Sequence, residues 1–279
     1  MILIADSGST KTDWALTDGG RVVKRVATQG INPFHQNAAI IHTVLTDELL
    51  PHLTPTIREV YFYGSGCRPE VVQPMVATLR LCFADASRIE VHGDLLGAAR
   101  ALCGHSEGIA CILGTGANSG LYDGTSIVRN TPPLGYILGD EGSGAVLGIR
   151  FLNALYKGML PTTVADAFFH ETQTTMEEAI ARVYRQPLAN RWLSSLSTFI
   201  ARHVDNPQVR GLVVDNFRLF FRRNVVQYGR RDLPVAAVGS IAWYYKPLLT
   251  EAASMEGFAM GTVSASPMEG LLAYHAGLN

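Results

Sequence analysis

The chain has 279 residues, of which 47% are hydrophobic and 17% are charged, and its formal net charge at pH 7 is −1. These values are typical of a compact globular protein of about two domains, and they argue against a nucleic-acid or membrane partner, which would favour a basic face. The sequence contains neither a signal peptide nor an apolar run long enough to span a membrane, so a cytoplasmic protein is expected. The 4 cysteines include no C-x-x-C pair, which argues against a zinc site or a cysteine-ligated cluster.

The N-terminal stretch predicts a ligand-binding turn between two strands. An apolar strand at residues 2–5 runs into a turn, residues 6–13, that combines a carboxylate with a glycine, hydroxyls and a lysine. Gly8 lets the backbone approach a ligand, and consecutive N–H groups in such a turn bind anions. Asp6 cannot bind phosphate directly, but it can hold a hydrated Mg²⁺ ion that carries the counter-charge of a phosphate. The remaining candidates in this turn are Ser9, Thr10, Lys11 and Thr12.

The same pattern of strand, polar turn, strand and hairpin occurs a second time. An apolar strand at residues 109–113 is followed by a turn of glycines, hydroxyls and an amide at residues 114–120, and then by a short strand and an Asp-Gly hairpin. Either turn alone could simply shape a hairpin, so the recurrence carries the functional interpretation. Two such units facing each other would bind a polyphosphate from two sides. The candidates in the second turn are Gly114, Thr115, Gly116 and Asn118.

Elsewhere strands alternate with helices, which predicts an α/β fold with a largely parallel core behind the antiparallel hairpins. Further strands are expected at residues 14–17, 21–26, 59–63, 88–91, 121–122, 125–129 and 235–238. Helices are expected at residues 35–50, 68–83, 95–103, 145–156, 164–170, 176–184, 191–204, 207–228, 241–256 and 268–276.

Asp94 is the most consequential single residue of the sequence. It follows a strand and a glycine and starts a helix, so it is expected to project from the carboxyl end of the sheet toward a crevice. A carboxylate there can accept a proton from a substrate hydroxyl. Local sequence alone favours a helix N-cap instead, and the two polar turns tilt the balance toward function.

Two further motifs open helices. Asp140 and Glu141 stand side by side between glycines, and capping by one of them explains only half of the motif. Gly239 and Ser240 follow a buried strand, where the missing side chain of the glycine would let a nucleotide base lie against the backbone. An ordinary glycine entry into a helix is the alternative for this second pair.

Together these motifs resemble the BadF/BadG/BcrA/BcrD-type ATPase family, and within it the N-acetylglucosamine kinases of the actin, sugar kinase and Hsp70 superfamily. The resemblance covers nearly the whole chain: the two polar turns match the phosphate motifs, Gly239–Ser240 matches the adenosine motif, and residues 139–143 match the Gly-Asp-Glu-Gly-Ser motif of the kinases. It implies two ribonuclease-H-like domains around an interdomain cleft. Residues 1–107 plus 265–279 would form the first domain, and residues 108–264 the second.

The resemblance also implies an activity. The chain would be an ATP- and Mg²⁺-dependent kinase of an amino sugar, with N-acetylglucosamine and its 6-hydroxyl as the expected acceptor and Asp94 as the catalytic aspartate. The residues expected to contact the sugar are Asn32, Thr115, Gly116, Asn118, Asp140 and Glu141. The alternative that stays open is a BadF-type ATPase that couples ATP hydrolysis to a partner protein without phosphorylating a sugar. The expected small-molecule partners are ATP and the sugar, and a homodimer is a further option.

Overall fold

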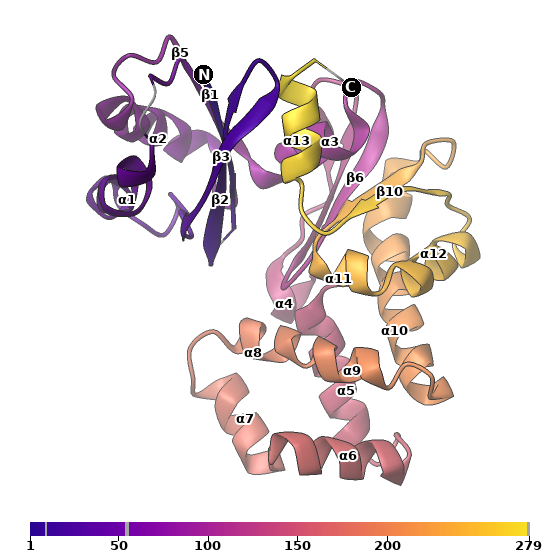
Figure 1. Ribbon diagram of the computed structural model, residues 1–279. Coiled ribbons are helices and arrows are strands. Elements are labelled where there is room, and N and C mark those ends of the chain that lie inside the picture. Colours follow the sequence, from indigo (N-terminus) through magenta and orange to yellow (C-terminus); the bar gives the residue numbers. More distant parts are fainter. Residues whose placement is uncertain (9, 54–55, 278–279) are drawn as a thin grey trace. The chain divides into compact units, whose positions relative to one another are not determined.

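The computed structural model describes residues 1–8, 10–53 and 56–277 (Figure 1). The chain divides into two compact units, each of which is described by itself below. Unit 1 comprises Met1–Ser106, Asp123–Ile127 and Ser266–Asn279, and unit 2 comprises Glu107–Tyr122 and Val128–Ala265. Among the described residues, none of the helices combines the length and the apolar character that crossing a bilayer requires.

Unit 1 is built on a five-stranded mixed sheet with the strand order β3-β2-β1-β4-β5. Its strands are β1 (Ile2–Ser7), β2 (Lys11–Asp18), β3 (Arg21–Gln29), β4 (Glu59–Gly64) and β5 (Arg88–Gly93). The central strand β1 pairs antiparallel with β2 and parallel with β4, which pairs parallel with β5. The register places Ser7, Gly64 and Gly93 in one row, so the three parallel strands end at the same edge of the sheet.

Helices cover both faces of this sheet. They are α1 (Ala38–Val44), α2 (Pro69–Cys82), α3 (Asp94–Cys103) and α13 (Met268–His275), with a π-helical turn at Leu45–Leu49 and a 3-10 turn at Leu50–His52 after α1. Alternate residues of β1 point to opposite faces. Leu3 packs with buried residues of α1 and α2, whereas Ile4 packs with α13.

Unit 2 contains a second five-stranded mixed sheet, in the order β10-β9-β6-β7-β8. Its strands are β6 (Gly108–Leu113), β7 (Ala117–Tyr122), β8 (Ile127–Asn130), β9 (Val235–Val238) and β10 (Met260–Ser264). β6 is antiparallel to β7 and parallel to β9, which is parallel to β10. The order therefore repeats that of unit 1 strand for strand, which confirms that one supersecondary unit occurs twice.

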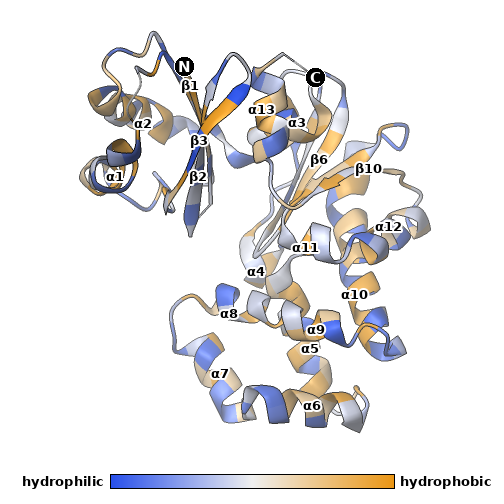
Figure 2. Cartoon of the chain, viewed as in Figure 1, coloured by the Kyte–Doolittle hydropathy of each residue, from blue (hydrophilic) through white to orange (hydrophobic). Residues whose placement is uncertain are grey.

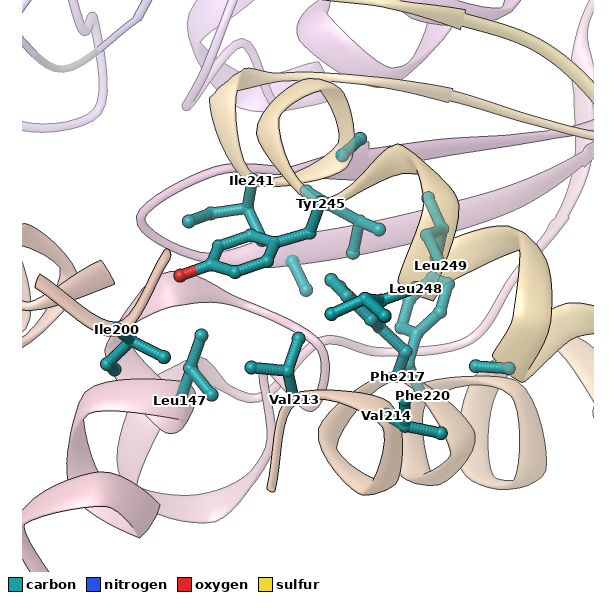
Figure 3. Packing of buried hydrophobic residues seen from close by; sticks show 14 of the residues in the cluster. Leu147, Ile200, Val213, Val214, Phe217, Phe220, Ile241, Tyr245, Leu248 and Leu249 are labelled. Carbon is teal, nitrogen blue, oxygen red and sulfur yellow. The ribbon is translucent and has the colours of Figure 1, made fainter. Parts of the chain in front are cut away.

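Helices between β8 and β9, and after β9, make up the rest of unit 2. They are α4 (Gly135–Leu138), α5 (Gly144–Tyr156), α6 (Thr162–Thr172), α7 (Met176–Tyr184), α8 (Ala189–Ser195), α9 (Ser197–Arg202), α10 (Pro207–Phe220), α11 (Ser240–Tyr244) and α12 (Lys246–Met255). Figure 2 shows hydrophobic residues along α5 and both classes of residue along α10. Their apolar faces meet in one core, where Leu147, Val213 and Phe217 lie close to Tyr245 (Figure 3).

The helices differ from the sequence prediction where the backbone departs from regular α geometry. The helix expected at residues 207–228 is α-helical only to Phe220, and it continues as a π-helical turn, Phe221–Val225, and a 3-10 turn, Val226–Tyr228. The helix expected at residues 241–256 is broken at Tyr245, because Pro247 at the start of α12 cannot continue the hydrogen bonding of α11.

Candidate active site

The candidate residues of unit 1 lie at the carboxyl edge of its parallel strands. Asp6 is near the end of β1, and Asp94 follows β5 directly as the first residue of α3. Oδ1 of Asp94 accepts the N–H of Leu95 at 2.8 Å. The side chain therefore makes a local bond at the helix start, while Gly93 rather than Asp94 occupies the N-cap position.

These two carboxyl groups lie in surroundings that are short of positive charge. Burial, together with the negative charges of Asp13 and Asp94, raises the pKa of Asp6 to about 7, against the lowering effect of Lys11. Lys11 is itself paired with Asp13, with Nζ 2.8 Å from Oδ1. Burial also raises the pKa of Asp94, against the lowering effect of the Leu95 backbone N–H. A cation bound at this edge would stabilise the ionised forms of both carboxylates.

The turn between β1 and β2 is tighter than the sequence predicts. The N–H of Gly8 donates to the carbonyl oxygen of Lys11 at 3.0 Å, and β2 already begins at Lys11. Gly8 and Thr10 are exposed at the tip, and Ser9 lies outside the described residues. The expectation that Thr12 is a donor of this turn is wrong, because Thr12 is fully buried and its hydroxyl lies 2.6 Å from that of Ser7.

Ser7 is a structural residue of this edge that the sequence analysis missed. Its hydroxyl donates to the carbonyl oxygen of Ile31 at 2.8 Å and accepts the N–H of the same residue at 3.1 Å. The next residue, Asn32, accepts the N–H of Phe34 at 3.0 Å. Gly66 leaves room for the Asn32 amide, because a Cβ on this glycine would lie 2.1 Å from Asn32 Oδ1. Asn32 is thus held beside the loop that follows β4.

In unit 2, the turn between β6 and β7 supports the start of α5. The N–H of Gly114 donates to the carbonyl oxygen of Gly116 at 2.9 Å. The carbonyl oxygens of Gly114 and Thr115 accept the N–H groups of Gly144 and Ala145, at 2.9 and 3.2 Å. The first N–H groups of α5 are therefore already paired within the chain.

Asp140 lies against this turn with an uncommon backbone conformation, φ +52°. Its N–H donates to the carbonyl oxygen of Pro133 at 2.8 Å, and its side chain accepts the N–H of Ala117. A Cβ on Gly116 would lie 3.0 Å from Asp140 Oδ2, so the carboxylate sits directly over that glycine. Burial raises the pKa of Asp140 to about 6, helped by the charge of Glu141.

Glu141 is tied to the π-helical turn that follows α10. Its Oε1 accepts from Arg223 Nη1 at 2.9 Å, and its Oε2 accepts from Asn224 Nδ2 at 3.2 Å. Glu141 therefore anchors the loop that presents Asp140. The partner residues lie more than eighty positions away in the sequence, and no local motif identifies them.

Gly239 directly follows β9 and packs closely against the end of β6. It has φ +122°, and a Cβ there would lie 2.3 Å from the carbonyl oxygen of Leu113, so no other residue fits this position without rearrangement. Ser240 is exposed as the first residue of α11. In the same unit, Oδ1 of Asn118 accepts from the N–H of Ser119 and from Asn130 Nδ2, at 2.9 and 2.8 Å.

Within unit 2, the fold therefore brings the second polar turn, Asp140 and Gly239 to one edge of the sheet. Within unit 1, it brings Asp6, Asp94 and the first turn to the corresponding edge. In the described part of the chain, no group of three or more His, Cys, Asp and Glu side chains could hold a metal by itself. The Asp6 carboxylate in its negatively charged surroundings suits Mg²⁺, which typically takes one or two protein oxygens together with water and phosphate.

Comparisons with known proteins agree with this architecture. No family model and no curated protein matches the chain. Among solved structures, a Porphyromonas gingivalis protein that is named provisionally as an N-acetylglucosamine kinase is 50% identical, with a TM-score of 0.96 over 99% of both chains. A Chromobacterium violaceum protein with the same provisional name is 18% identical, with a TM-score of 0.75 over 98% of both chains.

A ROK family glucokinase from Streptomyces griseus, solved with glucose and AMPPNP, is 14% identical, with a TM-score of 0.52 over 98% of this chain and 97% of the glucokinase. At such low identity, this structure and the one from C. violaceum show a shared fold alone. The full-length identity to the P. gingivalis protein shows the family. The chain belongs to the N-acetylglucosamine kinase-like family of this P. gingivalis protein, and its two five-stranded sheets have the fold of the actin-like ATPases and sugar kinases.

Proposed function

We propose that this protein is an ATP-dependent kinase that phosphorylates an amino sugar, with N-acetylglucosamine and its 6-hydroxyl as the favoured acceptor. The observation that carries the proposal is the placement of Asp94 and Asp6 at one edge of unit 1, where one carboxylate can accept a proton and the other can hold a metal ion. The 50% identity to the P. gingivalis protein supports the choice of an amino sugar. Because the proposed reaction consumes ATP, we expect it to take place in the cytoplasm.

Asp94 is the proposed general base. As the sugar oxygen attacks the γ-phosphorus, its proton would pass to the Asp94 carboxylate, a new O–P bond would form, and the bond to the bridging oxygen of ADP would break. Burial raises the pKa of this carboxyl group, which makes it a stronger base than an exposed aspartate. Phosphoryl transfer otherwise depends mainly on positioning and charge neutralisation.

The polar turn of each unit is a proposed nucleotide-binding element. Bound Mg²⁺ would neutralise phosphate charge, and Asp6 would hold it through water. Backbone groups of the two polar turns would bind the phosphates, and Gly239 and Ser240 would accommodate the nucleoside. The proposed phosphate ligands are Gly8, Ser9, Thr10, Lys11, Gly114, Thr115 and Gly116.

The sugar would be bound by Asn32, Asn118, Asp140 and Glu141, with Thr115 and Gly116 nearby. Asp140 is the strongest candidate, because the backbone fixes it and its carboxylate can accept hydrogen bonds from two hydroxyls. Each oxygen of Glu141 already accepts one hydrogen bond, so its contribution to sugar binding would use the remaining lone pairs.

The direct test is ADP release with Mg²⁺, ATP and a panel of N-acetylglucosamine, N-acetylmuramate and glucosamine. We expect at least one sugar to raise turnover about tenfold or more above the sugar-free rate, because a bound sugar hydroxyl is positioned for attack whereas water is not. 6-Deoxy-N-acetylglucosamine is the matched control, because it lacks the acceptor oxygen and should not raise turnover. Equal turnover with and without every sugar would contradict the proposal, and turnover that requires a partner protein instead would support the ATPase alternative.

Two glycine substitutions separate ligand binding from folding in unit 2. Nothing lies within 4 Å of the position that a Cβ on Gly114 would take, whereas a Cβ on Gly239 would meet backbone 2.3 Å away. We therefore expect Gly114→Ala to weaken binding of AMPPNP several-fold with an almost unchanged melting temperature. Gly239→Ala should lower the melting temperature by several degrees, a typical effect of a strained backbone. A strongly destabilised Gly114→Ala variant would contradict this assignment.

A further inference from the structure

Three polar side chains of unit 1 form a hydrogen-bonded chain on the face of the sheet that α13 covers. Arg100 Nη1, on α3, donates to the hydroxyl oxygen of Tyr63, on β4, at 2.7 Å. The Tyr63 hydroxyl also lies 2.9 Å from His275 Nε2, on α13. One hydroxyl group thus connects a strand and two helices.

The direction of these hydrogen bonds follows from the chemistry of the three groups. Arginine only donates, so the Tyr63 oxygen accepts from Arg100, and its own proton is free to point to His275. Burial, helped by the charge of Arg100, lowers the pKa of His275 to about 4, so the ring is neutral near pH 7 and Nε2 can accept. Burial also raises the pKa of Tyr63 to about 12, which keeps its proton in place. The Tyr63 hydroxyl therefore accepts one hydrogen bond and donates another in a single arrangement, whereas Nε of Arg100 is buried without a partner among the described residues.

Two glycines allow α3 to pack closely against its neighbours. A Cβ on Gly97 of α3 would lie 2.9 Å from Tyr63 Cβ, so the helix backbone rests on the tyrosine side chain. About one helical turn further along α3, a Cβ on Gly270 of α13 would lie 2.1 Å from the carbonyl oxygen of Ala101. α3 therefore packs closely against β4 and α13 at two positions, and Asp94 is its first residue.

We propose that Tyr63 is a positioning residue for the reaction: its hydroxyl, bonded to Arg100 and His275, fixes α3 and thereby the carboxylate of Asp94. This inference rests on the proposed function, because it concerns the placement of the proposed base. Tyr63, on β4, is also the register partner of Asp6, on β1. It therefore also supports the strand that carries the proposed metal-binding carboxylate.

The test is Tyr63→Phe, which keeps the ring under Gly97 and removes only the hydroxyl. We expect kcat to fall about tenfold, because displacing a reacting group by a fraction of an ångström reduces the rate steeply, while KM for ATP and for the sugar stays within about twofold. His275→Gln keeps an acceptor for the Tyr63 proton, so it should retain more activity than His275→Leu.

Tyr61→Phe is the matched control. Tyr61 lies two residues earlier on the same strand and faces the same side, and its ring also contacts His275, with ring centroids 3.9 Å apart. Its hydroxyl donates to Glu59 of its own strand at 2.5 Å, so its removal should leave kcat within about twofold. Wild-type kcat in Tyr63→Phe, or an equal loss in both variants, would overturn the inference.

A second measurement separates this inference from the proposed function. Hydrogen exchange of the α3 backbone amides needs no sugar or ATP, and we expect it to be faster in Tyr63→Phe than in wild type or Tyr61→Phe. Unchanged exchange would overturn the positioning role. A wild-type protein without sugar-dependent turnover would contradict the kinase proposal, whatever the exchange shows.

Discussion

Asp94→Asn is expected to lower the rate of sugar phosphorylation by about 10²–10⁴-fold, the usual contribution of a positioned general base. The asparagine side chain has the same shape, and its oxygen can still accept the N–H of Leu95, so the start of α3 is preserved. The amide of the asparagine, however, cannot accept the proton of the sugar hydroxyl. Binding of AMPPNP, measured by calorimetry, should stay close to wild type.

This substitution distinguishes catalysis from capping. If Asp94 served only as a hydrogen-bond acceptor for the helix, Asp94→Asn would keep its activity, whereas Asp94→Ala would lose stability because the Leu95 N–H loses its partner. Full activity of Asp94→Asn together with a lower melting temperature of Asp94→Ala would therefore contradict the base assignment.

The repeated unit is the part of the fold that the sequence predicted well. The strand, turn and hairpin at residues 2–26 recur near residue 109, and the two sheets share one strand order. β10 was missed, because its sequence, Met260 to Ser264, contains a glycine, has a single buried residue, and pairs with β9 through an irregular register. Its existence follows only from the topology, in which it is the counterpart of β5.

The local motifs of the candidate site were visible in sequence, whereas the contacts that hold them were not. Gly-rich turns and an aspartate after a strand are local patterns. The prediction for Thr12 was wrong because β2 already begins at Lys11. Thr12 therefore belongs to the strand, and its side chain points into the core beside Ser7. The bonds of Glu141 to Arg223 and of Tyr63 to His275 join distant segments, and no periodicity reveals such pairs.

Asp6→Asn is expected to abolish Mg²⁺-dependent turnover and, at the same time, to stabilise the protein above pH 7. The pKa of Asp6 in the folded protein is about 7, above the value of about 3.9 in an unfolded chain. The folded state therefore binds the proton more tightly, and the resulting stability is complete below pH ~4 and is lost as the pH rises through 7. Above pH 7 the folded protein carries a partly buried carboxylate that burial, Asp13 and Asp94 all disfavour.

Asparagine removes this ionisation, so the stability of Asp6→Asn relative to wild type should increase from near zero at pH 4 to a plateau above pH 7. The gain should be about 1–3 kcal/mol after allowance for solvent screening, which corresponds to several degrees in melting temperature. Thermal unfolding from pH 4 to pH 8 measures it.

The exposed Asp123 is the control for this experiment. Its carboxylate accepts the N–H groups of Thr125 and Ser126 at 2.8 Å, and these bonds lower its pKa. Asp123→Asn should therefore show no gain in stability at pH 8.

The ionised Asp6 carboxylate is also the group that would attract Mg²⁺. Mg·ADP should therefore raise the melting temperature of wild type at pH 8 more than that of Asp6→Asn. Equal Mg·ADP shifts in both proteins would contradict the metal-binding role, and a stability gain that does not depend on pH would contradict the raised pKa. A carboxylate that destabilises the empty protein at the pH where ATP must bind is expected at a functional site, since selection for folding alone would replace it.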